Sequence, residues 1–111
     1  MGLQVRASKL LNAAIATGAG ESLEPLQGPL LDRTFQATGQ TSSGAGSVTV
    51  DVEVSDDKAN WIVQRTITLT LSSAVSTDGY TTRAPWKYVR GNVTAISGTG
   101  AAVTLWIGIL M

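Results

Sequence analysis

Alternation of apolar and polar side chains between residues 47 and 71 is the feature that most constrains the fold of this chain. Valine occupies every second position from Val48 to Val54, and Thr49, Asp51 and Glu53 stand between the valines. Successive side chains of a β-strand point to opposite faces, so this segment is predicted to be a strand with one apolar and one polar face. A polar stretch, SDDKAN, separates it from a second alternating segment. We therefore predict a long β-hairpin.

The second segment, from Trp61 to Leu71, repeats the pattern after the polar turn. Its apolar parity consists of Trp61, Val63, Ile67, Leu69 and Leu71. Its polar parity consists of Gln64, Thr66, Thr68 and Thr70. Both strands of the hairpin are expected to bury one face against the rest of the molecule.

Further strands are predicted on both sides of this hairpin. Met1 to Ser8 is expected to be an arm or an edge strand, and other strands are expected at residues 9–17, 21–26, 30–38, 80–83, 86–96 and 103–110. The strand at residues 30–38 places on one face Leu31, Arg33, Phe35 and Ala37. The inward face of the last strand is predicted to carry Val103, Leu105, Ile107 and Ile109. Its outward face then carries Trp106 and Leu110.

Gly, Ser, Asp and Pro residues mark the predicted connections. Residues 39–47, GQTSSGAGS, are expected to form a flexible loop. Turns are expected at residues 27–29 and at the dipeptide Asp78-Gly79, and residues 97–100 are expected to close a hairpin. A β-bulge is predicted near Gly91, because neither face of the strand at 86–96 is cleanly apolar.

About eight short strands with regularly spaced turns and no helix predict an all-β, two-sheet sandwich. A jelly roll is the first choice, and an immunoglobulin-like sandwich is the second. We expect an N-terminal arm or edge strand at residues 1–8 and one sandwich domain at residues 9–111. A chain of 111 residues is long enough to form one core.

The composition excludes several kinds of chemistry. The chain has no cysteine and no histidine, so disulfides, thiolate or imidazole metal sites and histidine-dependent triads are excluded. Its formal net charge is zero, which argues against nucleic acid as a partner. The apolar run at residues 103–111 is too short for a membrane-spanning helix. Charged residues are 14% of the chain, and such a surface suits packing against another protein.

The acidic residues do not predict a metal or an active site. Asp56, Asp57 and Asn60 lie close together in the polar turn, but their spacing does not match a calcium-binding EF-hand loop, and turns ordinarily use these residues. Glu21 with Glu24, and Asp51 with Glu53, are the available carboxylate pairs. Asp51 and Glu53 are expected on a solvated strand face where nothing would raise a pKa. We predict no catalytic residue, metal, cofactor or small-molecule substrate, and no enzymatic activity.

The aromatic residues have two alternative interpretations. Trp61, Trp86 and Tyr88 could form a platform on which a sugar stacks, although a sandwich of this size needs most of its aromatic residues in the core. Trp106 differs, since its neighbours of opposite parity fill the core without it. It is expected either at a protein interface or in a central strand covered on both faces.

An ordered set of motifs resembles small structural proteins of tailed bacteriophages. The strings are GSVTVDVEVSDDKANW and TITLTLSSAVSTDGYTTRAPWKYVRGNVTAISGTGAAVTLWIG. In that group a valine-alternating strand, a Ser-Asp/Asn-Asp turn before Trp, a DG(Y/F)xTxAPW segment, YVR and a final SGTGA(A/T)VT strand recur in this order. The likeness spans roughly residues 10–108. Within the group, the chain is most similar to the capsid decoration proteins of epsilon-fifteen-like podoviruses, also called staple or cement proteins.

The resemblance implies a jelly-roll protein on the outer capsid surface of a virion. It implies a homodimer that binds the major capsid protein, bridges neighbouring subunits and resists the pressure of the genome. It brings no catalytic residues. The contact residues that we expect for this role are Leu3, Val5, Trp106, Leu110 and Met111. The alternative is a carbohydrate-binding or tail-fibre module that uses Trp61, Trp86 and Tyr88.

Overall fold

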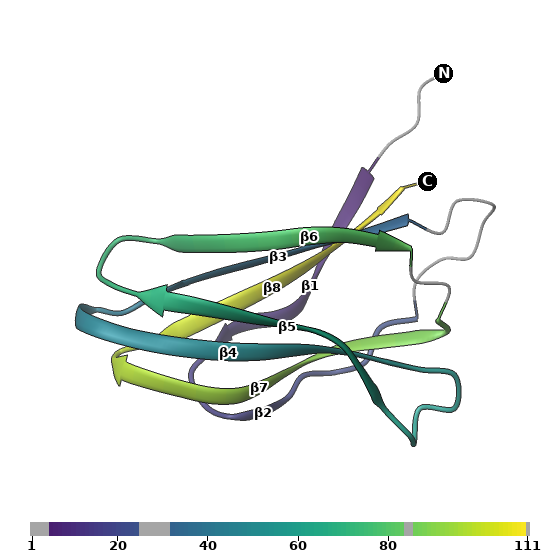
Figure 1. Ribbon diagram of the computed structural model, residues 1–111, viewed down its shortest axis with the longest axis horizontal. Coiled ribbons are helices and arrows are strands. Elements are labelled where there is room, and N and C mark those ends of the chain that lie inside the picture. Colours follow the sequence, from purple (N-terminus) through teal and green to yellow (C-terminus); the bar gives the residue numbers. More distant parts are fainter. Residues whose placement is uncertain (1–4, 25–31, 84–85, 111) are drawn as a thin grey trace.

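The computed structural model describes residues 5–24, 32–83 and 86–110 (Figure 1). This part of the chain contains eight β-strands and no helix. The strands are β1 (Val5–Ala14), β2 (Gly18–Ala19), β3 (Asp32–Gln40), β4 (Ser43–Ser55), β5 (Ile62–Leu71), β6 (Ser76–Arg83), β7 (Tyr88–Thr99) and β8 (Ala102–Leu110). Within those residues there is accordingly no helix that could span a membrane.

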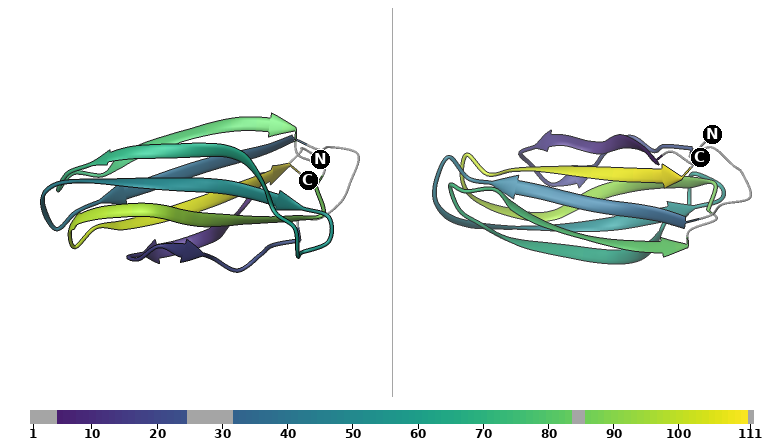
Figure 2. Two further views of the ribbon diagram at one scale, coloured as in Figure 1. Left: turned by 60° about the horizontal axis from the view of Figure 1, so that its bottom comes forward. Right: turned by 90° about the horizontal axis from the view of Figure 1, so that it is seen from above.

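The strands form two antiparallel sheets that pack face to face (Figure 2). Sheet A has the order β1-β8-β3-β6, and sheet B has the order β2-β7-β4-β5. The first four strands pair with the last four in reverse order, β1 with β8, β2 with β7, β3 with β6 and β4 with β5. This wrapped arrangement is the jelly roll, so the first choice of fold is confirmed.

The valine alternation of β4 supplies the sheet B side of the core. Val48, Val50, Val52 and Val54 are at most 1% exposed. Sheet A contributes the facing side chains, Phe35, Ala37, Val103, Leu105, Ile107 and Ile109, which are also buried. Burying one such aliphatic side chain stabilises the folded state by roughly 1.5–3 kcal/mol. The alternating segments of β4 and β8 therefore contribute much of the stability of the sandwich.

Arg33 shares the buried face of β3, as its parity predicted, and is 1% exposed. Its Nη1 donates a hydrogen bond to the carbonyl oxygen of Asp32 at 3.2 Å. Burial lowers the pKa of Arg33, and the Asp32 carboxylate opposes that change. Strand periodicity therefore determines the side of this residue more strongly than its charge does.

Three predicted connections are wrong. Residues 39–47 are almost entirely strand, because β3 continues to Gln40 and β4 begins at Ser43. Asp78-Gly79 lies inside β6, opposite Ala37 and Gln36 of β3. Residues 97–100 do not close a hairpin, since β7 belongs to sheet B and β8 to sheet A. At the first two places pairing with a neighbouring strand overrode local turn propensity. At residues 100–101 the chain does turn, but the turn connects the two sheets.

Register shifts change which side chains face the core. The register of β1 with β8 shifts between Lys9 and Leu11, and Leu10 and Leu11 are both buried. In β5 the register with β4 shifts next to Glu53, between Val63 and Arg65, and the predicted inward face is lost on the N-terminal side. Val63 is consequently 50% exposed, while Ile67, Leu69 and Leu71 are buried as predicted. In β7 the shift lies at Thr94, three residues after the expected position at Gly91.

At the N-terminal side, β1 crosses the boundary expected between residues 8 and 9 and forms an edge of sheet A. The short strand expected at residues 21–26 is represented by Leu23, which exchanges two backbone hydrogen bonds with Val89. The turn expected at residues 27–29 lies outside the described residues.

Candidate interaction surface

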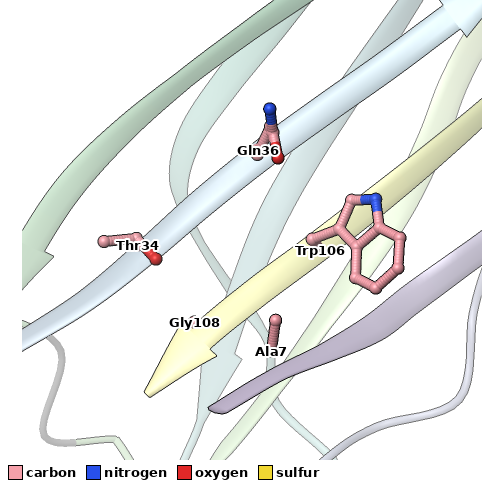
Figure 3. A pocket seen from close by; sticks show the side chains of 5 residues that line it. All are labelled: Ala7, Thr34, Gln36, Trp106 and Gly108. Atoms are coloured by element: carbon pink, nitrogen blue, oxygen red, sulfur yellow. The ribbon is translucent and has the colours of Figure 1, made fainter. Parts of the chain in front are cut away.

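Trp106 lies at the centre of the outer face of sheet A, the face that points away from sheet B (Figure 3). Its strand, β8, is flanked by β1 and β3. A shallow depression of about 310 Å³ beside the indole is lined by Ala7, Thr34, Gln36, Trp106 and Gly108. Lys9 places its Nζ 4.9 Å from the ring centroid. We call this region the Trp106 face.

Strand register explains the depression. Trp106 stands opposite Lys9 of β1 and Gln36 of β3. Two residues further along β8, Gly108 stands between Ala7 and Thr34. Small side chains on three neighbouring strands therefore lie beside the large indole. None of them projects as far from the sheet as the indole does, and this leaves a depression along one side of the ring.

Charge is sparse on this face. Lys9 and the Asp32–Arg83 pair are the charged residues among its described members, and the pair lies at the strand ends with Arg83 Nε 3.6 Å from Asp32 Oδ1. Around Trp106 the lining residues carry hydroxyl, amide, methyl or no side-chain groups. A sparsely charged surface with a central tryptophan has the composition of the middle of a protein interface.

The structure tests the five expected contact residues to different extents. Trp106 is half-buried in a central strand, but no other described element covers its outer side. For the described residues, the alternative in which both faces of its strand are covered does not hold. Val5 and Leu110 pair with each other at the ends of β1 and β8, and their side chains lie outside the described part. Leu3 and Met111 also lie outside it.

The three aromatic residues of the predicted sugar platform differ in what they contact. Trp61 stacks on Arg90, whose Cζ lies 4.1 Å from the ring centroid. Tyr88 has the ammonium groups of Lys58 and Lys87 at 5.7 and 5.4 Å from its ring centroid. Trp86 instead packs against the hydrophobic core. The three aromatic side chains thus have three different environments.

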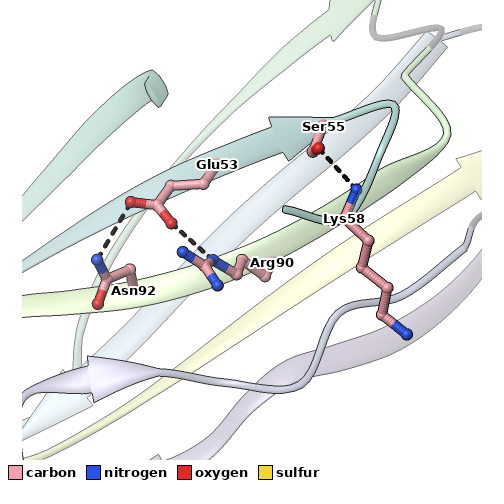
Figure 4. A network of polar contacts seen from close by, with 5 residues as sticks. All are labelled: Glu53, Ser55, Lys58, Arg90 and Asn92. Atoms are coloured by element: carbon pink, nitrogen blue, oxygen red, sulfur yellow. Dashed lines mark hydrogen bonds and ion pairs between the residues drawn. The ribbon is translucent and has the colours of Figure 1, made fainter. Parts of the chain in front are cut away.

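A polar network occupies the outer face of sheet B (Figure 4). Glu53 Oε1 accepts a hydrogen bond from Arg90 Nε at 2.7 Å, and Glu53 Oε2 accepts one from Asn92 Nδ2 at 3.1 Å. Glu53 is only 7% exposed, so the expectation of a solvated position is wrong for this residue. Both oxygens of the Glu53 carboxylate thus accept hydrogen bonds, one of them from the arginine on which Trp61 stacks. These bonds stabilise the sheet.

The turn that follows β4 is held by Asp57. Its Oδ1 accepts hydrogen bonds from the backbone N–H groups of Ala59 and Asn60 at 2.9 and 2.8 Å, and from the Ser55 hydroxyl at 2.9 Å. These bonds, together with one from the Asn60 side chain, hold the pKa of Asp57 well below its usual range. The residues thus serve the turn, and no group of three potential metal-ligating side chains occurs within the described ranges.

The other carboxylates do not form a joint site. Asp51 accepts a hydrogen bond from the Thr66 hydroxyl at 2.6 Å, whereas Glu53 points to Arg90. Glu21 and Glu24 are exposed. Sequence reasoning identified Trp106 through its parity but missed Lys9, Thr34 and Gln36 beside it. Only the pairing of β1 and β3 with β8 brings them together, and no signal within one strand encodes that register.

These features define an eight-stranded jelly-roll sandwich, one sheet of which carries a tryptophan that no other described strand or loop covers. The chain matches no protein family model and no curated protein. Among solved structures it is similar to PBSX exported protein XepA, with a TM-score of 0.57 and 17% sequence identity. The similarity covers 93% of this chain and 36% of that chain, so this chain spans about a third of the length of its neighbour. At that identity the likeness shows the fold.

Proposed function

We propose that this chain is a non-enzymatic structural protein of a bacteriophage, which binds the outer surface of the capsid and staples neighbouring major capsid protein subunits. The observation that carries the proposal is the half-buried Trp106 at the centre of an uncovered, nearly uncharged sheet face. Tryptophan in such a setting contributes strongly to protein–protein affinity, because a partner can remove its large apolar surface from water.

One further observation supports a bacteriophage origin, and a second supports the expected fold. The motif order between residues 10 and 108 resembles that of capsid decoration proteins, for which a jelly-roll fold was expected. The neighbour among solved structures, PBSX exported protein XepA, shares the expected sandwich fold and supports only that part of the proposal. In the proposed role the chain acts as a homodimer on the virion. Its partner is the major capsid protein, and it needs no nucleic acid, membrane or small-molecule ligand.

The test uses particles of the phage that encodes this chain, purified after deletion of its gene. Wild-type protein is added back, and the temperature at which the particles release their genome is measured. We expect added protein to raise that temperature. The Trp106→Ala variant should bind the particles roughly 30-fold more weakly, as expected for an interface residue worth about 2 kcal/mol.

Thermal unfolding of the free variant serves as the control for folding. Because the indole lies outside the core, the melting temperature of the Trp106→Ala variant should stay close to that of the wild type. Particles whose stability does not respond to the wild-type protein would count against the proposal. A Trp106→Ala variant that unfolds but binds normally in its folded fraction would remove Trp106 from the interface.

The alternative function, a carbohydrate-binding or tail-fibre module, has weaker support. It relied on Trp61, Trp86 and Tyr88 acting together, but Trp86 packs on the core and Trp61 is stacked on Arg90. Glycan-array binding that disappears in Trp61→Ala would revive this alternative.

A further inference from the structure

Four connections gather at one end of the sandwich, on the left in Figure 1. They are residues 15–17, 41–42, 72–75 and 100–101. The antiparallel pairing requires this grouping, because the C-terminal ends of β1, β3, β5 and β7 all point the same way. We call this end, made by the four connections and the strand ends next to them, the turn end.

The turn end is free of charged side chains. Residues 10–20, 34–50, 66–77 and 91–111, which contain the four connections, include no Asp, Glu, Lys or Arg. Asp78, the third residue of β6, is an exposed charge close to this end. Toward the opposite end Asp32 lies near Arg83, and the Asp56–Lys58 turn approaches Lys87. Such an uneven distribution of charged residues along the long axis is unexpected for a surface that faces only water, because exposed turns usually carry charge.

Two large aliphatic side chains project from the turn end. Ile15 is 75% exposed and Val75 is 63% exposed. A depression of about 300 Å³ beside Ile15 is lined by Ile96, Ser97, Gly98, Gly100 and Ala101. Exposed aliphatic groups beside small uncharged residues resemble the central part of a protein interface, which is depleted of charge.

Hydrogen bonds hold these connections to one another. Thr41 N donates to the Ser72 carbonyl at 2.9 Å, and Ser42 N donates to the Thr99 carbonyl at 2.9 Å. The Ser76 hydroxyl donates to the Thr70 carbonyl at 2.7 Å. Since three connections are tied together, the surface is ordered before any partner arrives and loses little entropy on binding.

We propose that the turn end is a second contact surface, which binds an uncharged patch on a capsid subunit next to the one held by the Trp106 face. This inference rests on the proposed function and assigns to the stapling role a second surface besides the Trp106 face. With contact surfaces on two different sides of the sandwich, each protomer of the proposed homodimer can bridge two capsid subunits by itself.

The chemistry of the turn end favours protein over other partners. Nucleic acid and anionic lipid bind through Lys and Arg, which are missing there. Sugars stack on aromatic rings, and residues 15–17, 41–42, 72–75 and 100–101 contain none. An uncharged protein surface is the partner that can cover Ile15 and Val75 without leaving a buried charge unpaired.

The size of the turn end argues against a free end-to-end pair of two copies. The two shorter dimensions of the molecule are 36 and 17 Å, so the cross-section of the end is roughly 600 Å². A stable pairwise interface usually buries about 800 Å² per partner. A contact of this smaller size suits a protein that is also held at the Trp106 face, since the second contact then forms within the assembly.

The experiment places one negative charge at the turn end. Val75→Glu and Ile15→Glu are compared with Ile62→Glu, a matched control with 53% exposure near the opposite end. Binding to the purified particles that lack the protein is measured by co-sedimentation. We expect each turn-end variant to bind about tenfold more weakly or worse, because the new carboxylate would be desolvated without a partner. Ile62→Glu should bind like the wild type.

Other outcomes would overturn the inference in distinguishable ways. Turn-end variants that bind like the wild type would refute the second surface and leave the proposed function standing. A wild-type protein that binds no particles would refute both. A concentration-dependent dimer that Val75→Glu dissociates would assign the surface to a second copy, and binding to phosphatidylcholine vesicles that Val75→Glu abolishes would assign it to lipid. Circular dichroism establishes that each variant is folded.

Discussion

At the scale of single residues, Asp51 and Glu53 show how two carboxylates on one strand face acquire different roles. They are two positions apart on the outer face of β4. Asp51 bonds to the hydroxyl of Thr66, whereas Glu53 forms an ion pair with Arg90 and accepts a second bond from Asn92. Removing Glu53 would leave Arg90 without its carboxylate beneath the Trp61 ring.

We expect Glu53→Ala to lower the free energy of unfolding by about 2 kcal/mol, because a charge-assisted, largely desolvated pair is lost. Asp51→Ala, the control, should cost less than about 1 kcal/mol, since it removes one bond at a more solvated site. Urea denaturation followed by tryptophan fluorescence measures both values. Equal losses in the two variants would contradict the different roles.

Asp57 leads to a prediction about pH. Its pKa is lowered in the folded protein by hydrogen bonds from Asn60, Ala59 and Ser55, from an ordinary value of 3.8. A depressed pKa stabilises the folded state above the ordinary pKa, and this contribution is lost as the pH falls below it. The melting temperature of Asp57→Asn should therefore lie below that of the wild type by a constant amount from about pH 5 to 8.

Below about pH 4 that gap should narrow, because the wild-type carboxylate increasingly takes up a proton on unfolding. Differential scanning calorimetry at several pH values follows both proteins. A gap that persists unchanged down to about pH 2 would show that the carboxylate charge is not what holds the turn.

At the scale of elements, β6 is the strand in which local sequence preference misled most. Asp-Gly favours a tight turn, but here it pairs with β3 without interruption from Ser76 to Arg83. Gly79 does not have a positive φ, so the turn conformation is not the reason for a glycine. A Cβ at this position would instead lie 2.5 Å from the carbonyl oxygen of Phe35.

Gly79→Ala should therefore destabilise the protein by about 1–3 kcal/mol, since β3 or β6 has to shift to admit the methyl group. Thr81→Ala, an exposed substitution in the same strand, should change stability by less than about 0.5 kcal/mol. Chemical denaturation compares the two variants. A neutral or stabilising Gly79→Ala would show that the backbone of β3 yields easily.

At the scale of the whole molecule, charge is distributed unevenly over the sandwich. Sixteen charged residues are present in total, eight of each sign, yet the turn end has none and the Trp106 face has few. Both proposed contact surfaces thus depend on apolar burial and shape more than on ion pairs. This charge distribution therefore predicts how binding to the capsid depends on salt concentration.

Affinity for the capsid particles should change by less than about threefold between roughly 0.05 and 0.5 M NaCl, because salt screens interactions between exposed charges and leaves apolar contacts in place. Co-sedimentation at several salt concentrations measures the change. Loss of binding by a factor of ten or more at high salt would place the contact on the charged end of the molecule.

Much of the fold could be predicted from the sequence because apolar and polar side chains alternate with the two-residue period of a β-strand. The alternation of Val48 to Val54 and of Val103 to Ile109 correctly predicted both sides of the core, and even Arg33 followed its parity. Prediction failed where an adjacent strand decided the outcome, at residues 39–47, at Asp78-Gly79 and at the bulge that turns Val63 outward.

The contact surfaces divide in the same way. Parity by itself placed Trp106 on the outward side of its strand and separated it from the core. Only the tertiary structure put Lys9, Thr34 and Gln36 around it, and only the jelly-roll order brought four uncharged connections to one end. The physical reason is that side-chain alternation is a property of one strand, whereas register and the gathering of turns depend on pairing between residues far apart in the chain.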